Sequence, residues 1–356
     1  MQKENKEENV RLPWFGFPIL WPFLKKYKLT VFLMVTLGML VSMIDAIYPL
    51  FTRYAINHFI GEKTLDTLPW FICLSLFTVF FQGWLNYRNV EDCSKVEMYI
   101  DRDLRNKAFS HLQEVPLSYY NQNSVGYIHA RVMSDAGKIG EMVSWRIMNL
   151  VWFGSYLVFI FVVMLIINTR LALYVLLLVP AASILIYLFQ NKLLGLNRKV
   201  REMNSVITAD INEGITGVKA IKTLGIEDKM WKAFGENTSK MYKISIHTTH
   251  YSALFSATVT MMSAVALSVV LWRGGMLTQE NLIEIGTFSI FMSYTLSMLG
   301  PIQDCVNTIA QLIGIGVNVE RYMKLINTKG EVFDSPEVIE KYGDSFNPKM
   351  ENWEEL

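Results

Sequence analysis

Cysteine is scarce in this sequence, and neither sign of charge prevails. The 356 residues include 3 cysteines, Cys73, Cys93 and Cys305, with no Cys-x-x-Cys pair. This usage argues against a disulfide framework, and we expect no metal site. The 33 Lys and Arg residues nearly balance the 32 Asp and Glu residues. The chain therefore lacks the basic surplus that would favour a nucleic-acid partner.

A phosphate-binding loop is missing as well. No G-x-x-x-x-G-K-[ST] motif occurs. The one Gly-Lys pair, Gly137-Lys138, is followed by Ile139 and has no glycine at the required upstream position. Nucleotide phosphates need such a backbone cradle. We therefore expect no catalytic residues, no cofactor and no ATPase activity in this chain alone.

Long apolar runs dominate what is present, and hydrophobic residues make up 52% of the chain. A helix needs roughly 17–25 residues to cross a hydrocarbon core of about 30 Å. Six runs fit this length, although the second is short and polar residues dilute the sixth: 29–51, 68–85, 147–167, 171–189, 251–272 and 282–302. These runs predict an all-α membrane protein with six transmembrane helices.

The N-terminal residues differ from these runs. The stretch "MQKENKEENVR" is charged, and "LPWFGFPILWPFL" before "KKYK" is aromatic and apolar. The prolines and the absence of a small-residue cleavage site argue against a signal peptide. The segment predicts a short helix in the membrane interface, and the alternative is an unstructured lead-in.

Positive charge is distributed unevenly between the segments that join the runs. The two long spacers, 86–146 and 190–250, have 61 residues each and hold 8 and 10 Lys or Arg residues. The three short connections hold 2, 1 and 1, whereas the first 28 residues hold 6 and the tail from Gln303 holds 5. Because cytoplasmic segments are enriched in Lys and Arg, we expect both termini and both spacers in the cytoplasm, with the chain in a bacterial plasma membrane.

Neither long spacer has the composition of a loop. Both are rich in helix-forming residues, and Pro116 is their only proline. An unstructured connection of this length is improbable in a folded domain. We predict that the membrane helices continue into the cytoplasm as two helical hairpins, with arms of about 45 Å and turns near residues 116 and 220. Stiff hairpins suit a transporter driven by a cytoplasmic motor, because they can transmit force.

Four segments resemble the ABC exporters that have six spans per subunit. The stretch "DLRNKAFSHLQEVPLSYYNQNSVGYIHARVMSDAGKI" resembles the first intracellular loop of that family, and "INEGITGVKAIKTLGIEDKMWKAF" resembles the second. The stretch "RGGMLTQENLIEIGTFSIFMSYTLSMLGPI" resembles the turn before the last span and that span, and "NVERYMKLINTKGE" resembles the exit helix. The resemblance implies the membrane domain of a multidrug-type half-transporter whose ATP-binding domain would follow residue 356. The alternative is a stand-alone subunit that binds a separate ATPase.

The resemblance also implies a domain organisation and partners. Residues 1–28 would form a cytoplasmic N-terminus with an interfacial elbow helix, 29–326 the transmembrane domain, and 327–356 a linker toward the missing nucleotide-binding domain. Two subunits, identical or different, would form a domain-swapped dimer in membrane lipid. ATP and Mg²⁺ would act through the associated nucleotide-binding domains. The substrate would be a small molecule, a lipid or a peptide, because exporters of all three share this frame.

In this family each hairpin tip carries a short coupling helix that contacts a nucleotide-binding domain. The resemblance places the first coupling helix at Ser118, Tyr119, Tyr120, Asn121, Gln122, Asn123, Ser124 and Val125. It places the second at Asp210, Ile211, Asn212, Glu213, Gly214, Ile215, Thr216 and Gly217. The pair Tyr119-Tyr120 would anchor the docking surface; the alternative is that these tyrosines stabilise the turn of their own hairpin.

Polar residues in or beside the first and last predicted spans are candidates for a substrate cavity. Asp45 lies in an apolar run, where a charged side chain costs roughly 2.5–3.5 kcal/mol, and Tyr48 follows on the same helical face. Gln303, Asp304 and Asn307 come at the end of the last run. The alternatives are an acid near the outer surface for Asp45 and a helix already leaving the membrane for the other three.

Methionine and histidine give two weaker hypotheses. Met261-Met262 suit either an adaptable cavity or ordinary helix packing. His247 and His250 have a spacing that could bind a metal, but no acidic ligand accompanies them. Ordinary polar residues at the entry of the fifth span are the simpler interpretation.

The leading function is thus the transmembrane domain of an ATP-driven exporter. The alternatives are a secondary transporter and a non-transporting membrane anchor. The paired hairpins argue against a secondary transporter, as does the lack of half-helices interrupted by Gly or Pro.

Overall fold

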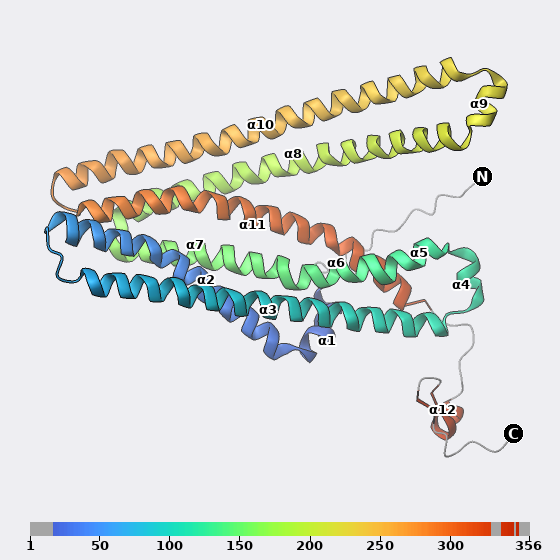
Figure 1. The fold of residues 1–356 in the computed structure, drawn as a ribbon, viewed down its shortest axis with the longest axis horizontal. Coiled ribbons are helices and arrows are strands. Elements are labelled where there is room, and N and C mark those ends of the chain that lie inside the picture. The colour runs from blue at the N-terminus through green and yellow to red at the C-terminus, as the bar shows by residue number, and fades with distance from the viewer. Residues whose placement is uncertain (1–16, 329–335, 345–346, 349–356) are drawn as a thin grey trace. The chain divides into compact units, whose positions relative to one another are not determined.

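A computed structural model describes residues 17–328, 336–344 and 347–348. Helices make up most of this part (Figure 1), and the strands there are β1 (Gly343–Asp344) and β2 (Asn347–Pro348), an antiparallel pair after the short α12 (Pro336–Tyr342). The charged N-terminal stretch and much of the predicted linker lie outside the described residues. The predicted all-α fold is confirmed.

Within the described residues, six helices are long and apolar enough to cross a membrane, as predicted. The helices that carry the spans are α2 (Lys28–Tyr54), α3 (Leu68–Glu114), α7 (Ile147–Ile167), α8 (Thr169–Thr216), α10 (Glu227–Gln279) and α11 (Ile285–Ile326). The sixth span was expected from residue 282. The helix starts three residues later, because residues 280–284 form the turn after α10, with Asn281 at a positive φ of 56°.

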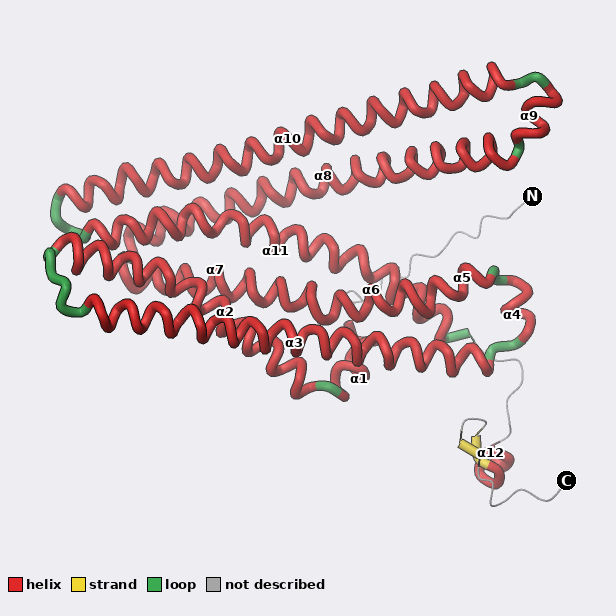
Figure 2. The backbone as a smooth tube through the Cα atoms, viewed as in Figure 1, coloured by secondary structure: helices red, strands yellow, loops and turns green. Residues whose placement is uncertain are grey.

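The helices extend well beyond the apolar runs and form two hairpins (Figure 2). In the first, α3 turns at Pro116 into α4 (Leu117–Gln122) and α5 (Val125–His129). A π-helical turn (Ala130–Asp135), α6 (Ala136–Glu141) and a second π-helical turn (Met142–Arg146) then lead into α7. In the second hairpin, α8 and α10 lie side by side and α9 (Val218–Leu224) forms the tip. Both turns fall where the spacer midpoints predicted them.

A short helix also precedes the first span. It is α1 (Phe17–Lys26), and Tyr27 separates it from α2. At the other end of α2, the helix continues as a π-helical segment (Ala55–Gly61). This segment leads into the short connection to α3.

The chain forms two compact units. One comprises residues 1–34, 90–148 and 311–356, and the other comprises residues 35–89 and 149–310. In the first unit, the Tyr322 hydroxyl donates to the carbonyl of Leu104 at 2.8 Å, and both residues are buried. In the second, the Tyr294 hydroxyl donates to the carbonyl of Ala46 at 2.6 Å within an apolar core. Each buried tyrosine thus has the partner that its hydroxyl needs.

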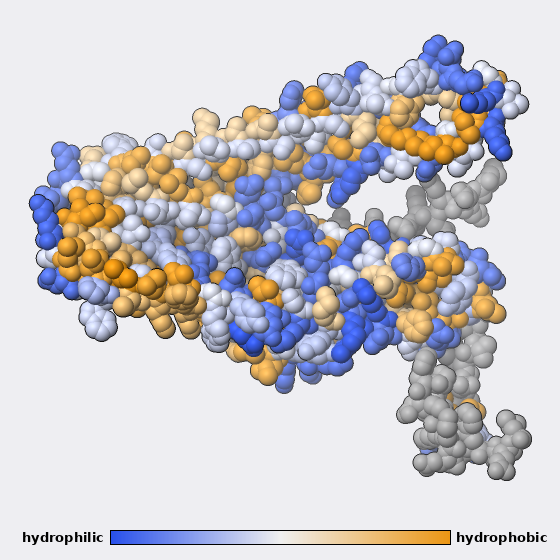
Figure 3. Space-filling view, in the orientation of Figure 1, coloured by the Kyte–Doolittle hydropathy of each residue, from blue (hydrophilic) through white to orange (hydrophobic). Residues whose placement is uncertain are grey.

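The membrane part of α3 exposes large apolar side chains. Trp70, Phe77 and Phe80 are 80%, 62% and 75% exposed. Figure 3 shows apolar surface gathered over the ends of α2 and α3 that face the connection between them. In water such a surface would be unfavourable, whereas it is the surface expected for contact with lipid.

Candidate functional site

The first hairpin tip is built around α4. Pro116 stands at the N-cap of this helix in an extended conformation that the fixed φ of proline allows, and Asn123 ends the helix in an extended conformation. Ser124 then caps α5, since its side chain accepts a hydrogen bond from the Tyr127 N–H at 3.2 Å. The predicted coupling segment, 118–125, therefore comprises most of α4, the turn and the first residue of α5.

The two tyrosines of this tip contact their own hairpin. Their rings meet edge to face, with centroids 5.9 Å apart, and the Tyr120 hydroxyl donates to the carbonyl of Leu112 at 2.6 Å. Burial, followed by the neighbouring Tyr127, raises the pKa of Tyr119. These contacts match the alternative interpretation, in which the tyrosines stabilise the turn.

Two aliphatic residues are the exposed apolar groups of the first tip. Leu117 is 81% exposed and Val125 is 84% exposed, whereas Tyr120 is 40% exposed. They flank the polar residues of the tip on both sides. Val125 is the last residue of the predicted coupling segment, whereas Leu117 lies one residue before it and was not predicted, although an apolar residue at the start of a polar turn was a visible signal.

A buried ion pair supports the tip from behind. Arg131 lies 2.6 Å from Asp135, and their side chains are 11% and 4% exposed. The guanidinium also lies over the Tyr127 ring, 4.3 Å from its centroid. This pair fixes the π-helical turn through which the returning arm leaves the tip.

The second tip differs from its prediction. Residues 210–216 form the last two turns of α8, and the separate short helix is α9, which follows. The break falls at Gly217, because an added Cβ there would lie 2.8 Å from the carbonyl oxygen of Glu213. Gly225, at a φ of 61°, then ends α9 in the left-handed conformation that favours glycine. The expected separate helix at Asp210–Gly217 is therefore shifted by about two turns.

The Asp45 side chain is held by a partner on the neighbouring helix. Gln82 of α3 donates from Nε2 to the Asp45 Oδ1 at 2.5 Å, and the Tyr48 hydroxyl donates to the Oε1 of the same glutamine. Gln82 thus links both predicted cavity residues of α2. Its role was not predicted, because the pairing depends on the register between two helices.

Asp45 and Asp304 line one cavity of about 480 Å³ in the second unit. The ring of Trp152 stacks on that of Tyr156 at this cavity, with centroids 5.5 Å apart and an angle of 2° between the planes. Phe153, Ser297 and Pro301 complete the lining. The other three predicted cavity residues, Tyr48, Gln303 and Asn307, are half-buried and do not belong to its described lining.

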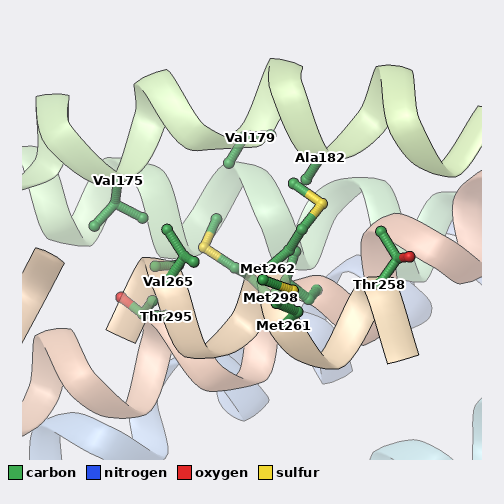
Figure 4. A pocket seen from close by; sticks show the side chains of 11 residues that line it. Val175, Val179, Ala182, Thr258, Met261, Met262, Val265, Thr295 and Met298 are labelled. Carbon is green, nitrogen blue, oxygen red and sulfur yellow. The ribbon is translucent and has the colours of Figure 1, made fainter. Parts of the chain in front are cut away.

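A second cavity, of about 210 Å³, lies between α8, α10 and α11. Its lining includes Met261, Met262 and Met298, and Figure 4 shows these side chains with Val179 and Val265 around the space. The described lining holds no charged group. The methionine pair therefore borders an apolar space, which flexible side chains can reshape.

The two histidines do not form a metal site with other side chains of the described residues. Within residues 17–328, 336–344 and 347–348, no group of three or more His, Cys, Asp or Glu side chains could hold a metal ion. His247 and His250 both lie on α10, within the extended arm that leads to the fifth span.

Comparison with known proteins identifies similar chains. The family model for the ABC transporter transmembrane region matches residues 31–302. The "ATP-dependent lipid A-core flippase" of Desulfotalea psychrophila is 24% identical over 315 residues, which cover 87% of this chain and 54% of the relative. "Putative multidrug export ATP-binding/permease protein YgaD" of Bacillus subtilis is 24% identical over 328 residues, with 89% and 56% covered. The chain spans about half the length of the curated relatives it matches.

Proposed function

This chain belongs to the family of ABC transporter transmembrane regions, and from that membership we propose that it forms the substrate pathway of an ATP-driven exporter. Its six apolar helices make it a multi-pass integral membrane protein. In the proposed assembly a second subunit completes the pathway, and nucleotide-binding domains supply the energy of ATP and Mg²⁺. The curated relatives named above carry export or flippase activity in their names, which supports this direction.

The observation that carries the proposal is the pair of long helical hairpins with short helices at their tips. The arms α3, α8 and α10 have 47, 48 and 53 residues, about 70–80 Å each and far more than a membrane requires. A secondary transporter or an anchor has no need of such rigid projections. We propose that α4 and α9, with the end of α8, dock on the nucleotide-binding domains.

The docking contacts follow from the exposure of the tip residues. A docking surface needs apolar side chains that are free before the partner arrives. At the first tip Leu117 and Val125 meet this requirement better than the tyrosines. At the second tip Ile215 and Leu224, each 68% exposed, offer equivalent contacts.

The cavity that Asp45 and Asp304 line is the proposed place of substrate contact. Its two carboxylates come from α2 and α11, and its aromatic wall comes from α7. A pathway residue must meet substrate in a membrane interior where charge is costly, and a half-buried aspartate beside aromatic rings suits that task. Residues 1–28, 29–326 and 327–356 retain their proposed roles as elbow segment, transmembrane domain and linker.

Reconstitution tests this proposal. The gene beyond the codon for Leu356, and its neighbours, would be read for a phosphate loop, and the complete transporter would be placed in proteoliposomes. We expect ATP hydrolysis that drives substrate movement, and loss of this coupling when Leu117→Ser and Val125→Ser are combined. Transport by this chain without ATP would instead support the secondary transporter.

A further inference from the structure

A polar cavity outside the proposed pathway lies in the first unit. It has a volume of about 510 Å³, and α1, α3 and α11 supply its walls. Lys26, Asn106 and Lys107 bring donors to it, and Phe23 and Met323 bring apolar surface. The proposed pathway does not use this cavity. The charged and apolar residues that line the cavity therefore suggest a separate ligand.

The acid at this cavity is already neutralised. Asp103 accepts hydrogen bonds from Lys26 Nζ at 2.8 Å, from the Tyr27 hydroxyl at 2.8 Å and from Arg102 Nε at 3.2 Å. Burial works against the ionised form of Asp103, but these hydrogen bonds outweigh it and lower its pKa. The ionised Asp103 carboxylate thus pairs with two cations, Lys26 and Arg102. This cluster alone has a net positive charge.

Lys107 adds a further cation, which is not one of the hydrogen-bond donors to Asp103 named above. Its Nζ lies 5.4 Å from the centroid of the Phe23 ring and lines the cavity. Asn106, beside it in sequence, adds an amide that can donate hydrogen bonds. The cavity therefore combines spare positive charge with neutral donors, and this combination fits a phosphate group.

The helix α1 and the start of α2 expose apolar side chains suited to acyl chains. Trp21 of α1 is 64% exposed, and Leu29 and Phe32 at the start of α2 are 69% and 65% exposed. The helical segment from Lys28 to Gly61 has 34 residues, or about 51 Å, slightly more than a bilayer with its headgroups. If Gly61 lies at one face of the membrane, the lysine cluster next to Lys28 lies at the headgroup level of the other.

From these observations we propose that the cavity between α1, α3 and α11 binds the phosphate headgroup of an anionic lipid, with Lys26, Asn106 and Lys107 as its donors. The acyl chains lie along the exposed face of α1 and α2. Tyr322 and Met323 of α11 border the site, so the lipid also contacts the helix that precedes the C-terminal tail. Bound lipid then holds α11 against α3, beside the hydrogen bond from Tyr322 to Leu104.

The test compares headgroups on the full chain in detergent. Native mass spectrometry would count bound phosphatidylglycerol and phosphatidylcholine, and a thermal shift assay would titrate each lipid and inorganic phosphate. We expect retention of phosphatidylglycerol and a rise in melting temperature with that lipid, with little effect of phosphatidylcholine. Equal binding of the two lipids would overturn the proposal. Stabilisation by inorganic phosphate at the concentration at which phosphatidylglycerol acts would also overturn it, in favour of a free-anion site.

A matched pair of variants locates the site. Lys107→Gln removes a cation while leaving the Asp103 cluster intact, so the chain should fold normally. We expect its affinity for phosphatidylglycerol to fall about fivefold, the equivalent of about 1 kcal/mol for one basic residue at an anionic surface. Lys232→Gln, an exposed lysine of α10, should bind as the unchanged chain does. Equal losses in both variants, or no loss in Lys107→Gln, would refute the assignment.

Discussion

At the first hairpin tip, the hydroxyl of Tyr120 allows a test of which residues stabilise the fold and which are free to dock. It donates to Leu112 at 2.6 Å within the hairpin. We predict that Tyr120→Phe lowers the stability of the chain alone by about 1 kcal/mol, the usual value of one such hydrogen bond. Thermal unfolding in detergent measures this loss. Leu117→Ser, at a residue 81% exposed, should leave the melting temperature unchanged; an equal loss in both would assign Leu117 to the fold as well.

The ion pair behind the tip is buried, and its loss should be costly. Arg131→Met would leave the Asp135 carboxyl, 4% exposed, without its ion-pair partner. We expect a loss of about 3–5 kcal/mol in the free energy of unfolding, and recovery of most of it when Asp135→Leu is added.

Thermal unfolding of the single and double variants measures both effects. Lys95→Met is the matched control, because the pair between Lys95 and Glu91 is 40% and 30% exposed and should contribute less than about 1 kcal/mol. If the double variant were no more stable than Arg131→Met alone, the loss would come from the missing ion pair itself and not from an unpaired buried carboxylate.

Asp45 offers a direct test of the proposed pathway. Asp45→Asn removes the charge but keeps an acceptor oxygen for Gln82. We expect normal folding, because the link to α3 survives, and a change in which substrates the complete transporter exports. Cationic substrates should lose more than neutral ones, since only they gain from the carboxylate. If the variant lost the same fraction of efflux for matched cationic and neutral substrates, relative to the unchanged transporter, Asp45 would not contact the substrate.

Single functional residues were predictable only where a polar side chain stands in or beside an apolar segment of the sequence. Asp45 stands out in an apolar segment, and Asp304 follows one closely. Gln82 does not stand out, because its role appears only when α2 and α3 are aligned. Val125 was predicted as part of the coupling segment, but the high exposure of Leu117 and Val125 is visible only in the folded turn.

At the scale of elements, length and composition were sufficient to predict both hairpins. Two spacers of 61 residues that are rich in helix-forming residues and contain one proline are too long for unstructured loops and favour helices. The turn of the second hairpin near residue 220 was predicted correctly, but the coupling helix was placed at 210–217, whereas α8 continues to Thr216 and the separate short helix α9 follows Gly217. The π-helical segments Ala55–Gly61, Ala130–Asp135 and Met142–Arg146 were not predicted, since their wider hydrogen-bonding pattern has no clear sequence signal.

The start of α11 is fitted closely to the π-helical segment after α2. The Gly286 N–H donates to Asn57 Oδ1 at 2.7 Å, and a Cβ at this glycine would lie 2.6 Å from the carbonyl oxygen of Arg53. We predict that Gly286→Ala lowers the free energy of unfolding by about 1–3 kcal/mol, because neither helix can accept the methyl group without moving.

Gly275→Ala is the control for this prediction. A Cβ at Gly275 would have no neighbour within 4 Å, and alanine favours a helix by up to about 1 kcal/mol over glycine. Its melting temperature should therefore stay level or rise. If both variants lost stability equally, helix packing in general, and not the contact with Asn57, would be responsible.

At the scale of the whole molecule, each unit is assembled from distant parts of the chain. Residues 90–148, which contain the first hairpin tip, share a unit with the described segments 17–34 and 311–328, whereas the second hairpin belongs to the unit with residues 35–89. The helices α2, α3, α7 and α11 run from one unit into the other. Movement at a tip therefore has a continuous helical route to the spans. Sequence patterns gave the spans and hairpins, but this grouping depends on tertiary contacts that no local pattern contains.

Orientation in the membrane is the property of the whole molecule that charge alone predicts. The Lys and Arg asymmetry places Lys63 and Gln279 outside and Ser124 and Lys222 inside, and all four residues are exposed. A chain without its three cysteines would receive one new cysteine at each position and then an impermeant maleimide in intact cells. We expect Lys63→Cys and Gln279→Cys to react at once, and Ser124→Cys and Lys222→Cys to react only after permeabilisation.

The four positions test more than the charge rule. Ser124 lies at the first tip and Lys222 in α9, so labelling of both from outside would place the proposed docking surfaces where no ATP is available. Labelling of only one of them would mean that the spans between the hairpins are odd in number, against the six apolar helices. Protection of both, with reaction at Lys63→Cys and Gln279→Cys, would put both tips on the side where a nucleotide-binding domain can reach them.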